Sequence, residues 1–173
     1  GRMSRLEKEG SDDAMKERRA LSVLEHALKE IGPQDFSRYQ ELLKLLRDPA
    51  YTWNYRAADD RLVIFTERID TMKWLSEHLQ QDLRLPANAI QTLHGGMSDI
   101  DQQKIVEEFG RDEAPVRILV ASDVASEGIN LHYLSHRMIH FDIPWSLMVF
   151  QQRNGRVDRY GQKVSPDIRY MVT

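Results

Sequence analysis

Apolar residues in the first fifty positions recur at the spacing of a helix. The first stripe consists of Leu21, Leu24, Leu28 and Ile31, which lie three or four residues apart. Gly32-Pro33 ends that stripe, because proline cannot continue the hydrogen-bond ladder of a helix. The second stripe consists of Phe36, Tyr39, Leu42, Leu43 and Leu46, and it stops near Asp48-Pro49. We therefore predict two helices here, followed by a connector at residues 51–60.

From Arg61 onward, short apolar runs alternate with helical patterns. Strands are predicted at residues 62–65, 89–93, 116–121, 138–141 and 168–172. One intervening helix is predicted from the stripe Ile69, Met72, Leu75 and Leu79. A second begins at Ser98, because Asp101 stands three residues later, as in a capping box. A third is expected to run from Ser146 to about Tyr160.

Continuous apolar strands separated by helices predict an α/β fold. The sheet is expected to be mostly parallel, with helices on both faces, and to follow an N-terminal helical segment. We place the helical lead-in at residues 1–55 and the α/β domain at residues 56–173.

Composition narrows the class of protein further. The chain has 173 residues, the size of one ordinary domain, and a formal charge of −3, which argues against a polycation. Cysteine is absent, so disulfides, thiolate catalysis and cysteine-ligated metals are excluded. The longest apolar runs have four residues, far short of the roughly 20 that a membrane-spanning helix needs.

Candidate chemistry lies in loops that follow predicted strands, where α/β proteins bind ligands. The most basic segment is 151–163, with Arg153, Arg156, Arg159 and Lys163 against Asp158. Arg156 and Arg159 are three residues apart, so on a helix they share a face and suit a phosphate group. The alternative is a solvated helix face whose arginines form ion pairs with nearby acids.

Two further loops suit an anion. Residues 121–131 directly follow a predicted strand and hold small residues that can direct backbone N–H groups at an anion, although a tight loop without ligand fits equally. His94-Gly95-Gly96 precedes a helix start and permits close approach of a phosphate, although a simple turn explains it too. No P-loop pattern is present. His132, His136 and His140 do not form a metal site, because no acid or cysteine completes one.

The ordered motifs resemble those of superfamily-two helicases. Residues 152–159 fit the Q-R-x-G-R-x-x-R pattern of motif VI, and Gly128-Ile129-Asn130-Leu131 resembles motif V of the Swi/Snf-type branch. Residues 62–66 resemble motif IV, and His94-Gly95-Gly96-Met97-Ser98 resembles the nucleic-acid-contact motif that follows it. The resemblance covers about residues 60–165 and is greatest to prokaryotic members.

This resemblance implies the second RecA-like lobe of a two-lobe motor. It implies that Arg156 and Arg159 are arginine fingers and that Asp123, Gly128, Asn130 and Gln152 lie at the ATP site. It also implies that Thr66, His94, Gly95 and Ser122 contact the nucleic-acid backbone. ATP and Mg²⁺ would be held mainly by a first lobe outside these residues, so the fragment alone is expected to be inactive.

Partners and location follow from the same resemblance. We expect double-stranded DNA, with RNA left open, the first RecA-like lobe of the same full-length chain, no membrane, and a cytoplasmic location at a prokaryotic nucleoid. Two alternatives remain: a non-catalytic RecA-like module that binds nucleic acid or protein, and a strand-separating helicase in place of a duplex translocase.

Overall fold

The computed structural model describes residues 14–22, 33–122, 135–142, 165 and 167–171. The chain divides into two compact units, Gly1–Phe36 and Ser37–Thr173. In the first unit, residues 14–22 form a helix. Most of the first predicted stripe, from Leu24 to Ile31, lies outside the described residues, as does the helix predicted at residues 146–160.

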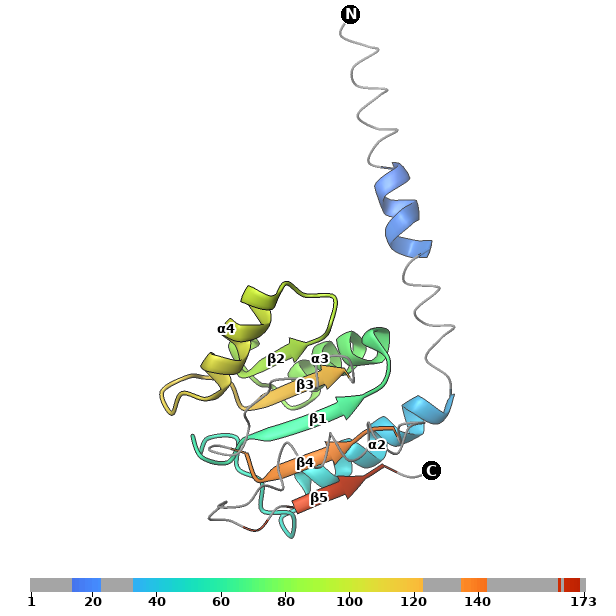
Figure 1. Ribbon diagram of the computed structural model, residues 1–173. Coiled ribbons are helices and arrows are strands. Elements are labelled where there is room, and N and C mark those ends of the chain that lie inside the picture. Colours follow the sequence, from blue (N-terminus) through green and yellow to red (C-terminus); the bar gives the residue numbers. More distant parts are fainter. Residues whose placement is uncertain (1–13, 23–32, 123–134, 143–164, 166, 172–173) are drawn as a thin grey trace, which may run out of the picture. The chain divides into compact units, whose positions relative to one another are not determined.

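The second unit is built on a five-stranded sheet in which every neighbouring pair is parallel (Figure 1). The strands are β1 (Leu62–Thr66), β2 (Ile90–Leu93), β3 (Ile118–Ser122), β4 (Arg137–His140) and β5 (Asp167–Tyr170). Their order across the sheet is β2-β3-β1-β4-β5. All five predicted strands are confirmed, with ends shifted by one or two residues.

The helices that accompany these strands in the described residues are α2 (Pro33–Arg47), α3 (Ile69–Asp82) and α4 (Asp99–Phe109). A short 3₁₀ turn, η1 (Ala87–Ala89), leads into β2. The predicted start of α4 is confirmed, because Ser98 Oγ accepts the backbone N–H of Asp101 at 3.2 Å. That bond satisfies one of the N–H groups that a helix leaves unpaired at its start.

The two faces of the sheet bury separate apolar clusters. Leu62 and Ile64 of β1 pack on one face, in a cluster with buried residues of α2 and α3. Val63 and Phe65 alternate onto the other face, in a cluster with Phe109 of α4. Because successive side chains of a strand point to opposite faces, a five-residue strand buried throughout must be covered on both sides. The prediction of an α/β sheet with helices on both faces is confirmed.

Helix α2 shares the core of the sheet. Its residues Tyr39, Leu42, Leu43 and Leu46 are buried in the same cluster as β1 and α3. Tyr39 Oη also donates a hydrogen bond to a carboxylate oxygen of Asp82 at the end of α3. The apolar stripe of α2 thus packs with the sheet. The boundary proposed at residue 55 stays a prediction.

Three arginines hold the loops at the amino-terminal ends of the strands. Arg61, before β1, is fully buried and donates to the backbone oxygens of Phe109 and Ala114, among others. Arg117 donates to the oxygen of Tyr55 at 2.9 Å. Arg137 of β4 forms an ion pair with Asp60 at 2.6 Å. The connector at residues 51–60 is therefore fixed to the sheet at several points.

Candidate nucleic-acid interface

The residues predicted to contact nucleic acid lie at one edge of the sheet. Thr66 and Ser122 are the last residues of β1 and β3, and they are direct partners in the parallel register. His94 follows the last residue of β2, which pairs with Ala121 of β3. Thr66, Ser122, His94 and Gly95 thus lie at the carboxyl ends of three adjacent strands, where α/β proteins bind ligands.

Thr66 is tied to the neighbouring strand by Asp142. Its side chain is fully buried, and its hydroxyl donates to Asp142 Oδ2 at 2.5 Å. The backbone N–H of Glu67 donates to the same carboxylate, at 2.9 Å and 3.1 Å. The hydroxyl proton of Thr66 is therefore directed at Asp142, and the carboxylate joins the ends of β1 and β4.

Asp142 is a residue to which the sequence analysis gave no role. The available signal was its position just after a predicted strand, where polar side chains collect at the binding edge of such sheets. Its partner could not be read from the sequence, because Thr66 and Asp142 meet only when β1 and β4 pair.

Ser122 has a buried hydroxyl with no hydrogen-bond partner among the described residues. Its side chain is fully buried at the end of β3. A buried polar group without a partner destabilises a fold, so such groups are rare and often belong to functional sites. Ser122 keeps one donor and its acceptor lone pairs available at the candidate edge.

His94 is held by its own turn. Gly96 N–H donates to His94 Nδ1 at 3.1 Å, and Met97 N–H donates to the His94 carbonyl oxygen at 3.2 Å. Because Nδ1 accepts a hydrogen bond, the hydrogen of the neutral ring is assigned to Nε2, which can donate outward. A Cβ on Gly96 would lie 3.0 Å from Nδ1, so a larger residue here would force the His94 ring to shift.

The start of α4 is less suited to a phosphate than its glycines suggested. Asp99 and Asp101 occupy its first turn, and both are exposed. Their carboxylates complement the partial positive charge of the helix start and repel a further anion there. His94 is therefore the better donor of this turn.

The other predicted site residues lie outside the described residues. These are Arg156 and Arg159, the predicted arginine fingers, and Asp123, Gly128, Asn130 and Gln152, predicted at the ATP site. Their roles stay predictions.

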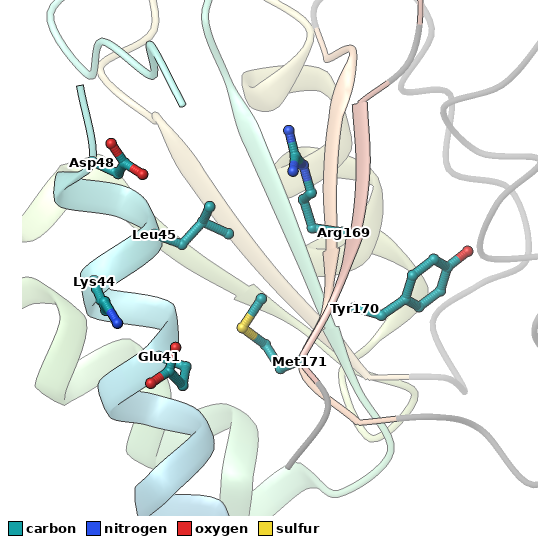
Figure 2. A pocket seen from close by; sticks show the side chains of 7 residues that line it. All are labelled: Glu41, Lys44, Leu45, Asp48, Arg169, Tyr170 and Met171. Atoms are coloured by element: carbon teal, nitrogen blue, oxygen red, sulfur yellow. The ribbon is translucent and has the colours of Figure 1, made fainter. Parts of the chain in front are cut away.

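A hollow of about 370 Å³ lies between α2 and β5, and none of the predicted nucleic-acid contacts, all of which are described, lines it (Figure 2). Leu45 and Met171 point into it, and Tyr170 points away. The charges that line it are balanced, with Glu41 and Asp48 against Lys44 and Arg169. Arg169 is also paired with Asp167 at 2.6 Å. This balance favours neither an anion nor a cation.

His140 packs among rings. It is fully buried, with its ring 4.8 Å from that of Tyr170 and 6.2 Å from that of Phe65. Within the described residues, no three histidine or acidic side chains are grouped as a metal site. No helix in this part of the chain is long and apolar enough to span a bilayer.

A parallel sheet covered on both faces, with candidate backbone contacts at its carboxyl edge, is the arrangement of a RecA-like motor lobe. The chain belongs to the helicase conserved C-terminal domain family, whose match covers residues 37–161. This confirms the membership expected from the motifs.

Curated relatives include two bacterial proteins. The chain is 30% identical, over 63% of its length, to RNA polymerase-associated protein RapA of Vibrio campbellii, and it covers 11% of that protein. It is 34% identical, over 66% of its length, to the uncharacterized ATP-dependent helicase YqhH of Bacillus subtilis, and it covers 19% of that protein. The chain thus spans less than a fifth of these relatives.

Among solved structures, the C-terminal part of the Fun30 ATPase domain is similar, with a TM-score of 0.62 and 21% sequence identity. The similarity covers 77% of this chain and 40% of the Fun30 chain. At this identity the likeness supports the RecA-like fold.

Proposed function

We propose that this chain is the second RecA-like lobe of an ATP-dependent translocase of Swi/Snf type. In this proposal it supplies arginine fingers for ATP hydrolysis and contacts the nucleic-acid backbone. The observation that carries the proposal is the family match, which includes β1 to β4 and residues 152–159. The relatives RapA and YqhH add support, because the second is named an ATP-dependent helicase.

Arg156 and Arg159 act at the ATP cleft in this proposal. The two arginines are three residues apart in the sequence, and each guanidinium can donate two parallel hydrogen bonds to the oxygens of a phosphoryl group. ATP with Mg²⁺, bound mainly by the first lobe, supplies the phosphoryl group whose transfer to water drives movement. The two arginines stabilise negative charge during that transfer, and Asp123, Gly128, Asn130 and Gln152 complete this lobe's side of the cleft.

The carboxyl edge of the sheet binds backbone phosphates of double-stranded DNA. His94 Nε2–H and the hydroxyl of Ser122 are the donors, and Gly95 allows close approach of the strand. Thr66 acts at the same edge, with its hydroxyl oriented by Asp142. The same contacts would serve RNA, since none of them reads a base. The site of action is the cytoplasm, at the nucleoid.

The experiment is a nucleic-acid-stimulated ATPase assay on the full-length protein. We expect Arg156→Ala and Arg159→Ala each to lower turnover at least tenfold, since an arginine finger contributes roughly 10³–10⁵ in rate. Lys104→Ala removes an exposed charge from α4 and should leave turnover unchanged. The isolated chain should hydrolyse no ATP above background. Normal stimulated turnover in both arginine variants would favour a non-catalytic binding module.

A further inference from the structure

A second hollow, of about 430 Å³, lies at the opposite edge of the sheet, where the strands begin. Its walls come from the end of α2, the connector before β1, and the turn after α3. The lining includes Arg47, Trp53, Tyr55, Arg56, Asp82 and Arg84. Among the described residues, none of those predicted to contact nucleic acid lines it.

The three arginines of this hollow have no carboxylate partner in the described residues. Arg84 makes no side-chain hydrogen bond or ion pair there. Arg56 lies over the ring of Tyr55 at 5.6 Å and donates to its hydroxyl at 3.3 Å. Arg47 donates to the backbone oxygen of Asp82 at 2.8 Å. The Asp82 carboxylate itself accepts the hydroxyl of Tyr39. Three guanidinium groups thus keep free donors.

Arg84 also occupies a position that suits glycine. Its φ is 52°, in the left-handed region, directly after the C-cap residue of α3. The N–H groups of Arg84 and Leu85 bond to the oxygens of Gln81 and Gln80, as in a Schellman motif. Glycine is usual at this position, because a Cβ is unfavourable there. The arginine side chain therefore costs stability here and gains no partner within the described fold.

The connector wall is fixed before any ligand binds. Trp53 Nε1–H donates to the backbone oxygen of Asp60 at 3.0 Å, and Asn54 N–H donates to the Asp60 carboxylate at 2.8 Å. Arg117 holds the oxygen of Tyr55. Binding at a rigid wall loses less conformational entropy than binding at a mobile loop.

We infer that this hollow binds carboxylate side chains from an acidic segment of a partner protein. The guanidinium fork matches a carboxylate bidentately, and the aromatic wall of Trp53 and Tyr55 gives the segment an apolar contact. Nucleic acid fits less well. The exposed acids Asp48 and Asp59 flank the arginines in sequence, and α2 and α3 end here with their partial negative charge. These repel an extended polyanion more than a single carboxylate.

The experiment measures binding of a fluorescein-labelled peptide that holds two glutamates among neutral residues to the full-length protein by anisotropy, with and without excess duplex DNA. We expect Arg84→Gly to weaken binding about tenfold, as the loss of one charge-assisted contact implies. Its thermal stability should not fall, because glycine suits this φ. Arg56→Gln should weaken binding similarly. Lys73→Gln removes the same charge from an exposed position of α3 and should change nothing.

The inference is overturned if the two-glutamate peptide does not bind, or if both arginine variants bind it as tightly as the wild type. It is also overturned if duplex DNA displaces the peptide and the same substitutions weaken DNA binding equally, because the hollow is then a nucleic-acid contact. Stimulated ATPase activity should be unchanged in Arg84→Gly, which separates this inference from the proposed motor function.

Discussion

Arg61 shows how this sequence uses a charged residue inside the protein. The guanidinium is buried, and no carboxylate of the described residues forms an ion pair with it; it donates to backbone oxygens around the end of α4, including those of Phe109 and Arg111. It also lies over the ring of Phe109 at 5.5 Å. Burial, together with the nearby charge of Arg117, lowers the pKa of Arg61. Its donors reach five backbone oxygens, those of Ala58, Glu108, Phe109, Arg111 and Ala114, and three of these oxygens also accept a second hydrogen bond.

We expect Arg61→Lys to destabilise the fold by about 2–3 kcal/mol. An ammonium group has three donors on a flexible stem and cannot span the oxygens that the planar guanidinium joins. The measurement is the urea midpoint at constant m value. Arg56→Lys, at an exposed position, is the matched control and should shift the midpoint little. Equal midpoints for the two variants would show that the buried contacts contribute no net stability.

Gly96 offers a prediction about binding at the single-residue scale. A Cβ at this position would lie 3.0 Å and 3.2 Å from two atoms of the His94 ring, so Gly96→Ala should displace the ring. We expect affinity of the full-length protein for duplex DNA to fall several-fold, roughly the 1 kcal/mol of one hydrogen bond. In Gly110→Ala the Cβ meets two backbone oxygens at 3.4 Å, far from His94, and affinity should be unchanged. If the NMR signals of the His94 ring are the same in Gly96→Ala as in the wild type, the ring has not moved and the prediction is wrong.

At the scale of elements, Asp142 joins the carboxyl ends of β1 and β4. We expect Asp142→Asn to destabilise the fold by about 1–3 kcal/mol, because an amide offers one acceptor where the carboxylate serves two donors, Thr66 and Glu67. Hydrogen exchange at the Glu67 amide should become faster. Asp59→Asn, at an exposed position, is the control. If the Glu67 amide exchanges at the wild-type rate, the carboxylate does not hold this edge.

Most elements could be predicted because their apolar patterns are local. The run from Leu62 to Phe65 indicates a strand by itself, and the stripe of α3 has helical spacing. The ends of strands were less predictable where a charged residue belongs to the strand. β4 begins at Arg137, one residue before the predicted start. This charged residue can belong to a buried strand because Asp60 forms an ion pair with its guanidinium and the backbone oxygen of Tyr51 accepts a hydrogen bond from it.

The site was predictable in outline only. The positions of Thr66, His94 and Ser122 at strand ends follow from the order of strands and loops. The bond from Thr66 to Asp142 and the unpaired hydroxyl of Ser122 depend on contacts between distant parts of the chain. At the opposite edge, Arg47 and Arg61 donate to backbone oxygens, and the sequence does not show which backbone oxygens will accept a side chain.

At the scale of the whole molecule, two buried tyrosines make the stability of the fold depend on alkaline pH: Tyr39 of α2 and Tyr51 of the connector. Burial, then the nearby Asp167 carboxylate, raises the pKa of Tyr51 to about 12, although the Arg137 and Arg169 guanidinium groups oppose this. Burial and the hydrogen bond to Asp82 raise the pKa of Tyr39 as well. Both phenols are therefore favoured in the protonated form by the folded state.

We expect the free energy of unfolding to fall as the pH rises from about 10 to 12. The stabilisation is complete below the usual tyrosine pKa of 10.0, where the phenol is protonated in both the folded and the unfolded state. Between that pH and the folded pKa only the unfolded phenol ionises, so the stabilisation is lost as the pH rises. For Tyr51 the loss is about 2–3 kcal/mol. Tyr51→Phe should flatten the decline measured by urea unfolding, whereas Tyr170→Phe should not. An equally steep decline in both variants would contradict the assignment.

The position of β1 at the centre of the sheet has a consequence for biosynthesis. Residue 62 pairs with residue 118 on one side and residue 137 on the other, so neither neighbour of β1 is close to it in sequence. Contacts between residues far apart in sequence form slowly, and a nascent chain leaves the ribosome with its amino terminus first. The apolar segment Leu62–Phe65 therefore leaves the ribosome long before either neighbour, and we expect it to be the segment that chaperones engage during translation.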